Sequence, residues 1–234
     1  MKPLRWGILG AAKFALQHMG PAIHAAQGAT LAAMATSSPT KAAAFRASVA
    51  NIKVYESYDD LLAATDIDAV YIPLPNHLHV DWTLKALDAG KHVLCEKPMT
   101  LMASEFDRLI SARDASGLLV AEAFMIVHHP QWLRAREIVA SGILGRLRHV
   151  AATFSFYNDD MTNIRNIASA GGGGLRDIGI YAFGSTRFVT GQEPHKITHA
   201  KVDYENGVDV FAQVAADFDD FDYCATISMR MFPR

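Results

Sequence analysis

Cysteine is scarce in this sequence, with only two among 234 residues. Cys95 and Cys224 lie far apart, so we do not expect a framework of disulfide bonds. Long apolar runs are also missing, since no stretch reaches the roughly 20 residues that a membrane-spanning helix needs. Lys13 interrupts the apolar stretch near the N-terminus, and no region typical of signal-peptide cleavage follows it. Together these absences predict a soluble, cytoplasmic protein.

An excess of charge of either sign is missing too. The chain has 22 basic and 24 acidic residues and a formal net charge of −2, so no global basic field attracts nucleic acid or anionic lipid. The three tryptophans are dispersed and form no stacking platform. Half of the residues are hydrophobic, and the length suits one large domain or two small ones. We therefore expect a globular protein with neither nucleic acid nor a membrane as partner.

The first half of the chain alternates strand-like and helical segments. Such alternation predicts βαβ units that form a buried parallel sheet with helices on both faces, which is an α/β fold. Gly20 and Pro21 are expected to kink or interrupt the first helix. The expected strands cover 4–9, 29–36, 52–55, 68–74, 91–97 and 118–124, and the expected helices cover 11–27, 38–48, 57–65, 77–90 and 100–117.

The second half has a different rhythm, with long strand-like segments around one central helix. In the last segment the odd-numbered residues from Tyr223 to Met231 share one face, which is the period of a strand. We predict an α+β domain with an open, mostly antiparallel sheet, and we place the boundary between the domains at Ala123. The sequence stops in strand-like residues at Arg234, so we expect this sheet to be incomplete. The expected strands cover 149–157, 196–204, 208–218 and 222–232, and the expected helices cover 130–141 and 175–190.

The turn after the first strand has the spacing of a dinucleotide-binding loop. Gly10, Ala12 and Ala15 occupy the three small-residue positions of the G-x-G-x-x-G pattern, and Lys13 and Phe14 lie between them. These positions allow a tight turn, a close approach of the backbone to a pyrophosphate and packing of helix on strand. An ordinary strand–turn–helix remains the alternative, but the position at the first strand of a βαβ series favours cofactor binding.

The residues after the second strand favour NADP(H) over NAD(H). NAD sites usually carry an acidic residue there, but the first acidic residue of this chain is Glu56, and six basic residues precede it. Ser37, Ser38 and Lys41 could instead donate to a 2′-phosphate. The alternative is that Ser38 only caps the next helix and that Lys41 is a solvated charge.

Four motifs together identify a family. They are "PLPNHLH" at 73–79, "HVLCEKPM" at 92–99, "FMIVHHPQW" at 124–132 and "GGGGLRDIGIYAFGSTRFVTG" at 171–191. With them the sequence resembles the glucose–fructose oxidoreductase, inositol dehydrogenase and rhizopine-catabolism (Gfo/Idh/MocA) family, closest to its NADP-dependent xylose and dihydrodiol dehydrogenases. The resemblance implies a dinucleotide-binding Rossmann domain over 1–123. It also implies a domain over 124–234 that binds substrate and forms a homodimer through its sheet.

The resemblance also implies roles for residues that follow two of the strands. Pro75, Asn76 and His79 are expected near the nicotinamide ribose. Asn76 could instead cap the next helix, and His79 could be a buried helix histidine. Glu96 and Lys97 belong to the E-K-P element, which places Lys97 beside the nicotinamide and the reacting carbon and in which the peptide bond before proline is often cis.

Asp177 and Tyr181 complete the candidate site. They are four residues apart, hence on one face of a helix. A free tyrosine has a pKa of about 10, and a nearby ammonium group such as that of Lys97 would lower it, so Tyr181 could exchange a proton with an alcohol. The alternatives are a core tyrosine and a solvated first-turn acid. Arg165 is a candidate contact for substrate or cofactor, and no metal site is expected.

The sequence therefore predicts an NADP-dependent oxidoreductase that transfers hydride between nicotinamide and a hydroxyl or carbonyl carbon of a sugar, polyol or cyclic diol. Lys97 and Tyr181 are expected to share one pocket. One alternative is a catalytically inactive dinucleotide-binding sensor of the same fold, and another is an imine or biliverdin-type reductase.

Overall fold

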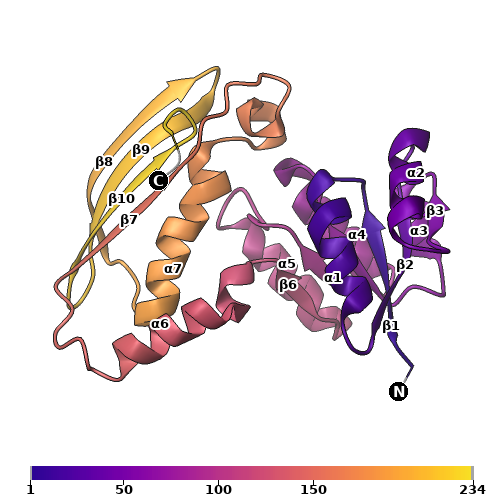
Figure 1. Cartoon of the computed structure of the whole chain (residues 1–234), viewed down its shortest axis with the longest axis horizontal. Helices are drawn as coiled ribbons and strands as arrows, with labels where there is room; N and C mark the ends of the chain where they lie inside the picture. The colour runs from indigo at the N-terminus through magenta and orange to yellow at the C-terminus, as the bar shows by residue number, and fades with distance from the viewer. Residues whose placement is uncertain (1, 233–234) are drawn as a thin grey trace. The chain divides into compact units, whose positions relative to one another are not determined.

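The structure is a computed structural model that describes residues 2–232. The chain divides into two compact units, Met1–Ala123 and Phe124–Arg234, which we describe separately (Figure 1). Arg234, where we expected the second sheet to break off, lies outside the described residues. Within residues 2–232 no helix is both long and apolar enough to cross a membrane.

The first unit is built on a six-stranded parallel sheet. Its strand order is β3-β2-β1-β4-β5-β6, the doubly wound order of a Rossmann fold. The prediction of a parallel α/β sheet is therefore confirmed. The strands are β1 (Leu4–Leu9), β2 (Ala29–Ala35), β3 (Lys53–Tyr55), β4 (Ala69–Ile72), β5 (His92–Cys95) and β6 (Val120–Glu122).

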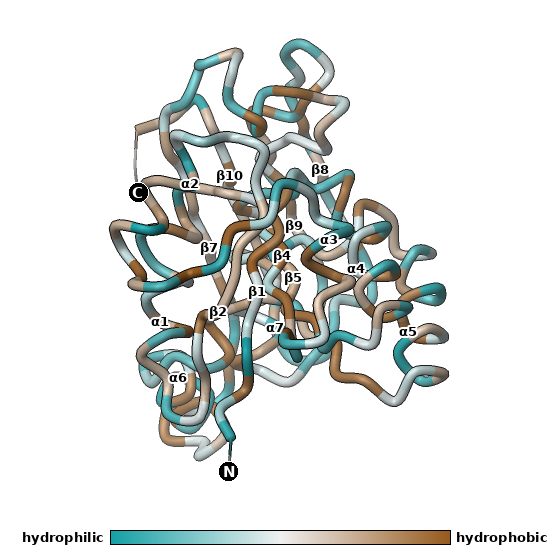
Figure 2. The backbone as a smooth tube through the Cα atoms, turned by 90° about the vertical axis from the view of Figure 1, so that its right-hand side faces the viewer, coloured by the Kyte–Doolittle hydropathy of each residue, from teal (hydrophilic) through white to brown (hydrophobic). Residues whose placement is uncertain are grey.

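Helices cover both faces of this sheet because successive strand residues point to opposite sides. Ile8 and Tyr71 pack on one side, and their neighbours Leu9 and Ile72 pack on the other; all four side chains are fully buried. The hydrophobic colour of β4 in Figure 2 reflects this burial on two faces. The first face carries η1 (Ala15–Met19), α1 (Gly20–Ala25) and α2 (Pro39–Ser48), and the second carries α3 (Tyr58–Ala63), α4 (His79–Asp88) and α5 (Glu105–Ser116).

At Gly20 and Pro21, where we expected a kink or an interruption, the helical segment changes from the π-helix η1 to the α-helix α1. Proline lacks the N–H that an α-helix would use at this position. The preceding turn widens into a π-helix over Ala15–Met19, and the N–H of Gly20 donates to the carbonyl of Ala15, five residues back. The local π turn accommodates the proline, and α1 then continues in regular α geometry.

An ion pair fixes the start of β1 to the residue that precedes β4. The Arg5 guanidinium donates to the Asp68 carboxylate from Nε at 2.9 Å and from Nη2 at 2.7 Å, and the peptide N–H of Arg5 donates to it at 2.8 Å. These hydrogen bonds lower the pKa of Asp68 to about 2.

This shift predicts a specific pH dependence of stability. Because the pKa of Asp68 is lower in the folded than in the unfolded chain, the pair stabilises the fold above pH about 4, and the contribution is lost as the pH falls towards 2. We expect Asp68→Asn to lower the free energy of unfolding at neutral pH by about 1 kcal/mol, since the carboxylate is 33% exposed and screened by water. Urea denaturation across this pH range checks the prediction. A variant as sensitive to acid as the wild type would contradict it.

The second unit contains a four-stranded sheet of order β7-β10-β9-β8. β8, β9 and β10 pair antiparallel, whereas β7 pairs with β10 in parallel. The predicted, mostly antiparallel sheet is confirmed, although β10 ends at Ser228 and is shorter than expected. The strands are β7 (His149–Ser155), β8 (Lys196–Glu205), β9 (Val208–Asp217) and β10 (Asp222–Ser228).

One long helical segment packs on a face of this sheet. Ile178 and Ala182 contact a buried cluster that includes Ala212, Tyr223 and Ile227 from β9 and β10. Figure 1 shows α7 lying along the sheet, with α6 beside it. The helical elements of the unit are η3 (Met125–His128), α6 (Pro130–Ala140), η4 (Ile164–Asn166), η5 (Ala168–Ala170), η6 (Leu175–Gly179) and α7 (Ile180–Thr190).

Candidate active site

The candidate cofactor residues of the first unit follow the carboxyl ends of β1, β2, β4 and β5. Parallel sheets bind ligands at this edge, next to the point where the strand order reverses. In this sheet the reversal lies between β1 and β4, which are neighbours.

The turn after β1 requires its glycine. Gly10 has a φ of +104°, and its N–H donates to the carbonyl of Ala35 at 3.0 Å. A Cβ at Gly10 would lie 2.9 Å from the side chain of Leu74, which would have to shift, and the positive φ strains any larger residue at this position. Ala15, at the third position of the pattern, is fully buried. Gly10 thus makes the tight turn of a dinucleotide-binding loop, and Ala15 provides its close packing of helix on strand.

The helix that follows begins beside exposed side chains. The N–H of Leu16 donates to the carbonyl of Ala12 at 3.1 Å, within the first turn. Lys13 and Phe14 are exposed, and the Phe14 ring lies 5.0 Å from the ring of His18. The start of a helix presents peptide N–H groups and a positive dipole end, which suit a pyrophosphate.

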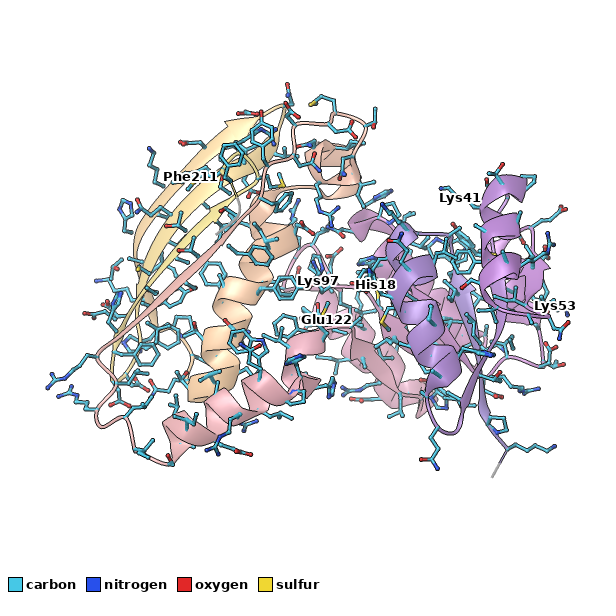
Figure 3. The ribbon with its side chains drawn as sticks, viewed as in Figure 1. His18, Lys41, Lys53, Lys97, Glu122 and Phe211 are labelled. Atoms are coloured by element: carbon cyan, nitrogen blue, oxygen red, sulfur yellow. The ribbon has the colours of Figure 1, made fainter. Side chains whose placement is uncertain are left out.

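Polar side chains follow β2. The hydroxyl of Ser38 caps α2 by accepting from the N–H of Lys41 at 3.4 Å, and the N–H of Ser38 donates to Thr36 at 3.2 Å. Ser37 and Lys41 are exposed, and Figure 3 marks Lys41 on α2. Ser38 is therefore a helix cap. Together with Ser37 and Lys41 it lies at the N-terminus of α2, where a bound anion is favoured.

His79 connects the segments that follow β4 and β5. It is fully buried, and its ring nitrogens lie 2.7 Å from the carbonyl oxygens of Leu74 and Pro98. Burial lowers the pKa of His79, although the two carbonyls and the nearby Glu96 and Glu122 oppose that shift. Both ring nitrogens contact the main chain, so His79 holds together the two loops that carry Asn76 and Lys97. Asn76 itself opens the short helix η2 (Asn76–Leu78), and Pro75 occupies the cap position before it.

The two histidines of this segment should respond differently to replacement. His79→Leu leaves two main-chain oxygens facing an apolar side chain, so we expect the free energy of unfolding to fall by about 2 kcal/mol. His77 is exposed, and His77→Leu should change this free energy by less than about 0.5 kcal/mol. Urea denaturation of both variants measures the difference. Equal effects would show that the contacts of His79 do not stabilise the fold.

The E-K-P segment is fixed by neighbouring strands. Glu96 accepts from the hydroxyl of Tyr71 at 2.5 Å and from the N–H of Lys97 at 3.3 Å. The Lys97–Pro98 peptide bond is cis, as the resemblance predicts. Lys97, labelled in Figure 3, is half-buried.

Glu122 supports the same segment and was not anticipated from the sequence. Its carboxylate accepts from the N–H of Met99 at 2.8 Å, from the end of β6 (Figure 3). The sequence feature that could have pointed to Glu122 is that it is the single acidic residue in an otherwise apolar strand. Cys95, next to the segment, is buried, and burial raises the pKa of its thiol, so it is unsuited to nucleophilic chemistry.

In the second unit the four glycines fill a confined space before η6. Gly173 has a φ of +124°, and a Cβ there would overlap the carboxylate of Asp209. A Cβ at Gly172 would overlap the main-chain carbonyl of Arg165, and the N–H of Gly173 donates to this carbonyl at 3.0 Å. The run therefore allows the backbone to pass between η4 and β9.

Arg165 and Asp177 form an ion pair, with Nε and Oδ2 2.6 Å apart. The Asp177 side chain is 15% exposed and that of Arg165 is 40% exposed. The structure thus brings together two residues that were selected from the sequence for separate reasons, and Arg165 orients the carboxylate of Asp177.

Tyr181 lies between two aromatic rings of its own unit. Its ring centroid is 5.6 Å from that of Phe124 and 5.7 Å from that of Phe154. These contacts restrict the ring on a half-buried face of α7, one turn after Asp177. Lys97 belongs to the other unit, so its expected approach to Tyr181 stays a prediction.

Two family models match the two units. One is described as "Oxidoreductase family, NAD-binding Rossmann fold" and matches residues 4–124. The other is described as "GFO/IDH/MocA C-terminal domain" and matches residues 132–232. Together they cover nearly all of the chain.

Several curated proteins are similar to this chain. An uncharacterized oxidoreductase from Rhizobium meliloti is 44% identical over 84% of this chain and 59% of that protein. A dTDP-3,4-didehydro-2,6-dideoxy-alpha-D-glucose 3-reductase from Streptomyces violaceoruber is 40% identical over 82% and 56%. A D-xylose 1-dehydrogenase (NADP(+)) from Haloferax volcanii is 37% identical over 92% and 66%. The chain thus spans 56–66% of the lengths of these relatives.

A solved structure extends the similarity to three dimensions. A 3-ketoreductase from Actinomadura kijaniata, in complex with NADP and TDP-benzene, superposes with a TM-score of 0.92 at 32% identity. The match covers 99% of this chain and 72% of that one.

Proposed function

The chain belongs to the GFO/IDH/MocA oxidoreductase family, and we propose that it catalyses reversible hydride transfer between NADP(H) and a hydroxyl or carbonyl carbon of a sugar, polyol or cyclic diol. The observation that carries the proposal is the E-K-P segment at the end of β5. There Tyr71 fixes Glu96, and the half-buried Lys97 follows directly. The spacing of Asp177 and Tyr181 in the second unit supports it.

The residues of the first unit fit NADP(H). The Gly10 turn and the helix start after it suit a pyrophosphate, and Ser37, Ser38 and Lys41 suit a 2′-phosphate at the start of α2. The relatives named above with NADP or NADP(+) in their descriptions favour the same cofactor. When bound, NADP(H) supplies or accepts the hydride.

The remaining chemistry is assigned to this chain's own side chains. Tyr181 exchanges a proton with the substrate oxygen, and Lys97 stabilises negative charge on the tyrosine and on that oxygen. Asp177, held by Arg165, orients the substrate. This division leaves Glu96, Glu122 and His79 to hold Lys97 and its loop in place.

The names of the relatives suggest which substrates to test. They include reductases of dTDP-linked keto sugars, a D-xylose dehydrogenase and a dehydrogenase of a cyclic dihydrodiol. A screen of these three kinds of substrate with the full-length protein, with NAD and NADP in parallel, tests the proposal by following the absorbance of reduced nicotinamide. We expect turnover with at least one of them and a preference for NADP. Tight NADP binding without turnover on any substrate would instead favour a catalytically inactive sensor.

We also propose a homodimer formed through the sheet of the second unit. Nearly all residues of β8 are exposed in the single chain, which supports this assignment. A monomeric mass by light scattering at working concentration would contradict it.

A further inference from the structure

We infer that Asp209 is a positioning residue of the active site, because its carboxylate caps and anchors the helical segment that carries Asp177 and Tyr181. Asp209 lies on β9, more than 25 residues after these two, and no sequence motif marks it. The inference rests on the proposed function, since it gives Asp209 a part in the same hydride transfer.

The carboxylate meets the helical segment at its first residue. The N–H of Leu175 donates to Asp209 Oδ2 at 2.6 Å. The residue at the cap position, Gly174, has no side chain that could accept a hydrogen bond, and a Cβ there would lie 3.3 Å from the same Oδ2. Asp209 therefore supplies from another strand the acceptor that the helix lacks locally.

Electrostatics favour a carboxylate at this point. The first N–H groups of a helix have no acceptors within the helix, and its N-terminus carries a partial positive charge. Hydrogen bonds to an ionised group are shorter and stronger than neutral ones, in keeping with the 2.6 Å separation of Leu175 N and Asp209 Oδ2. Asparagine at this position would keep an acceptor and lose the charge.

The glycines make this contact possible. Asp209 Oδ1 occupies the space into which a side chain at Gly173 would extend, and the positive φ of Gly173 turns the chain beside it. Any larger residue at Gly173 would displace either the carboxylate or the start of the helix. The glycine run thus leaves the space that the Asp209 carboxylate from β9 occupies.

The anchor is close to the catalytic side chains along the chain. The N–H of Asp177 donates to the carbonyl of Gly173 at 3.0 Å, which binds the first helical turn to the anchored glycine. Tyr181 follows one turn later in the same continuous segment. A shift of about 1 Å in reacting groups can reduce a rate about 100-fold, so loss of the contact between Asp209 and the helix should lower the rate of hydride transfer.

The test compares three variants of the full-length protein. Asp209→Ala removes the acceptor, Asp209→Asn keeps an oxygen without the charge, and Asp217→Asn makes the same chemical change at the far end of β9 as a matched control. We expect Asp209→Ala to lower kcat about 10- to 100-fold with KM for NADP(H) within about two-fold, because the cofactor residues lie in the other unit. Asp209→Asn should recover part of the loss, and Asp217→Asn should match the wild type.

Hydrogen exchange provides a readout that does not depend on turnover. The amide of Leu175 should exchange at least about ten-fold faster in Asp209→Ala than in the wild type, with the sheet amides unchanged. Wild-type kcat in Asp209→Ala, or unchanged exchange at Leu175, would overturn the inference. If the wild type transfers no hydride to any substrate, the proposed function fails, and the exchange measurement still decides whether Asp209 anchors the helix.

Discussion

Replacement of Lys97 by alanine is expected to lower kcat by about 10³-fold or more, while the dissociation constant for NADP(H) changes by less than about three-fold. Lys97 lies within a segment that is held on both sides, by Tyr71 at Glu96 before it and by His79 and Glu122 at Pro98 and Met99 after it, so its backbone should stay in place when the side chain is removed. The ammonium would act on charge that develops during the reaction, so its loss should appear in kcat more than in binding. Steady-state kinetics and fluorescence titration with NADPH measure the two constants.

Two further variants make the Lys97 result specific. Lys97→Arg retains a positive charge with a different shape and should recover only part of the activity. Lys85→Ala removes an exposed lysine paired with Asp59 in the same unit and should leave kcat unchanged. Turnover of Lys97→Ala near that of the wild type would remove Lys97 from the reaction.

Replacement of Tyr181 by phenylalanine is expected to lower kcat by about 10²- to 10⁴-fold. The change deletes one hydroxyl and keeps the ring that contacts Phe124 and Phe154, so the melting temperature should stay within a few degrees of the wild type. The pH profile of kcat/KM should also lose the ionisation that belongs to the tyrosine. Kinetics across pH, together with thermal unfolding, check both parts.

Tyr204 offers the matched control, since it is a tyrosine of the same unit that is 67% exposed. Tyr204→Phe should leave kcat and the pH profile unchanged. A Tyr181→Phe variant with wild-type kcat and an intact pH profile would assign proton transfer to another group.

The first unit could be predicted well because its signals are local. Each strand and helix has its own apolar pattern, and Gly10 is required by the backbone angle of one turn. At Gly20 and Pro21 the same local reasoning predicted a kink or an interruption, and the helical segment changes there from π to α geometry. Propensity at one residue could not anticipate that neighbouring turns would widen.

The supports of the candidate site could not be read from the sequence. Glu122 and Asp209 bind main-chain N–H groups of segments more than 20 residues away, and such pairs are set by the tertiary fold. For His79 the sequence left a cofactor contact and a buried helix histidine as alternatives, and it could not show that both ring nitrogens meet main-chain carbonyls. The partners of the four glycines are likewise set by the tertiary fold, since the glycines pack against Asp209 and the backbone of Arg165.

The most direct test of the central claim is isotopic. The full-length protein is incubated with NADPH deuterated at the transferable C4 position and with a keto sugar that supports turnover in the screen. The account predicts one deuterium on the former carbonyl carbon for each NADPH oxidised, with the label lost from the cofactor. Oxidation of NADPH without deuterium on that carbon would contradict the account, because the hydride would then not pass from the nicotinamide to the sugar.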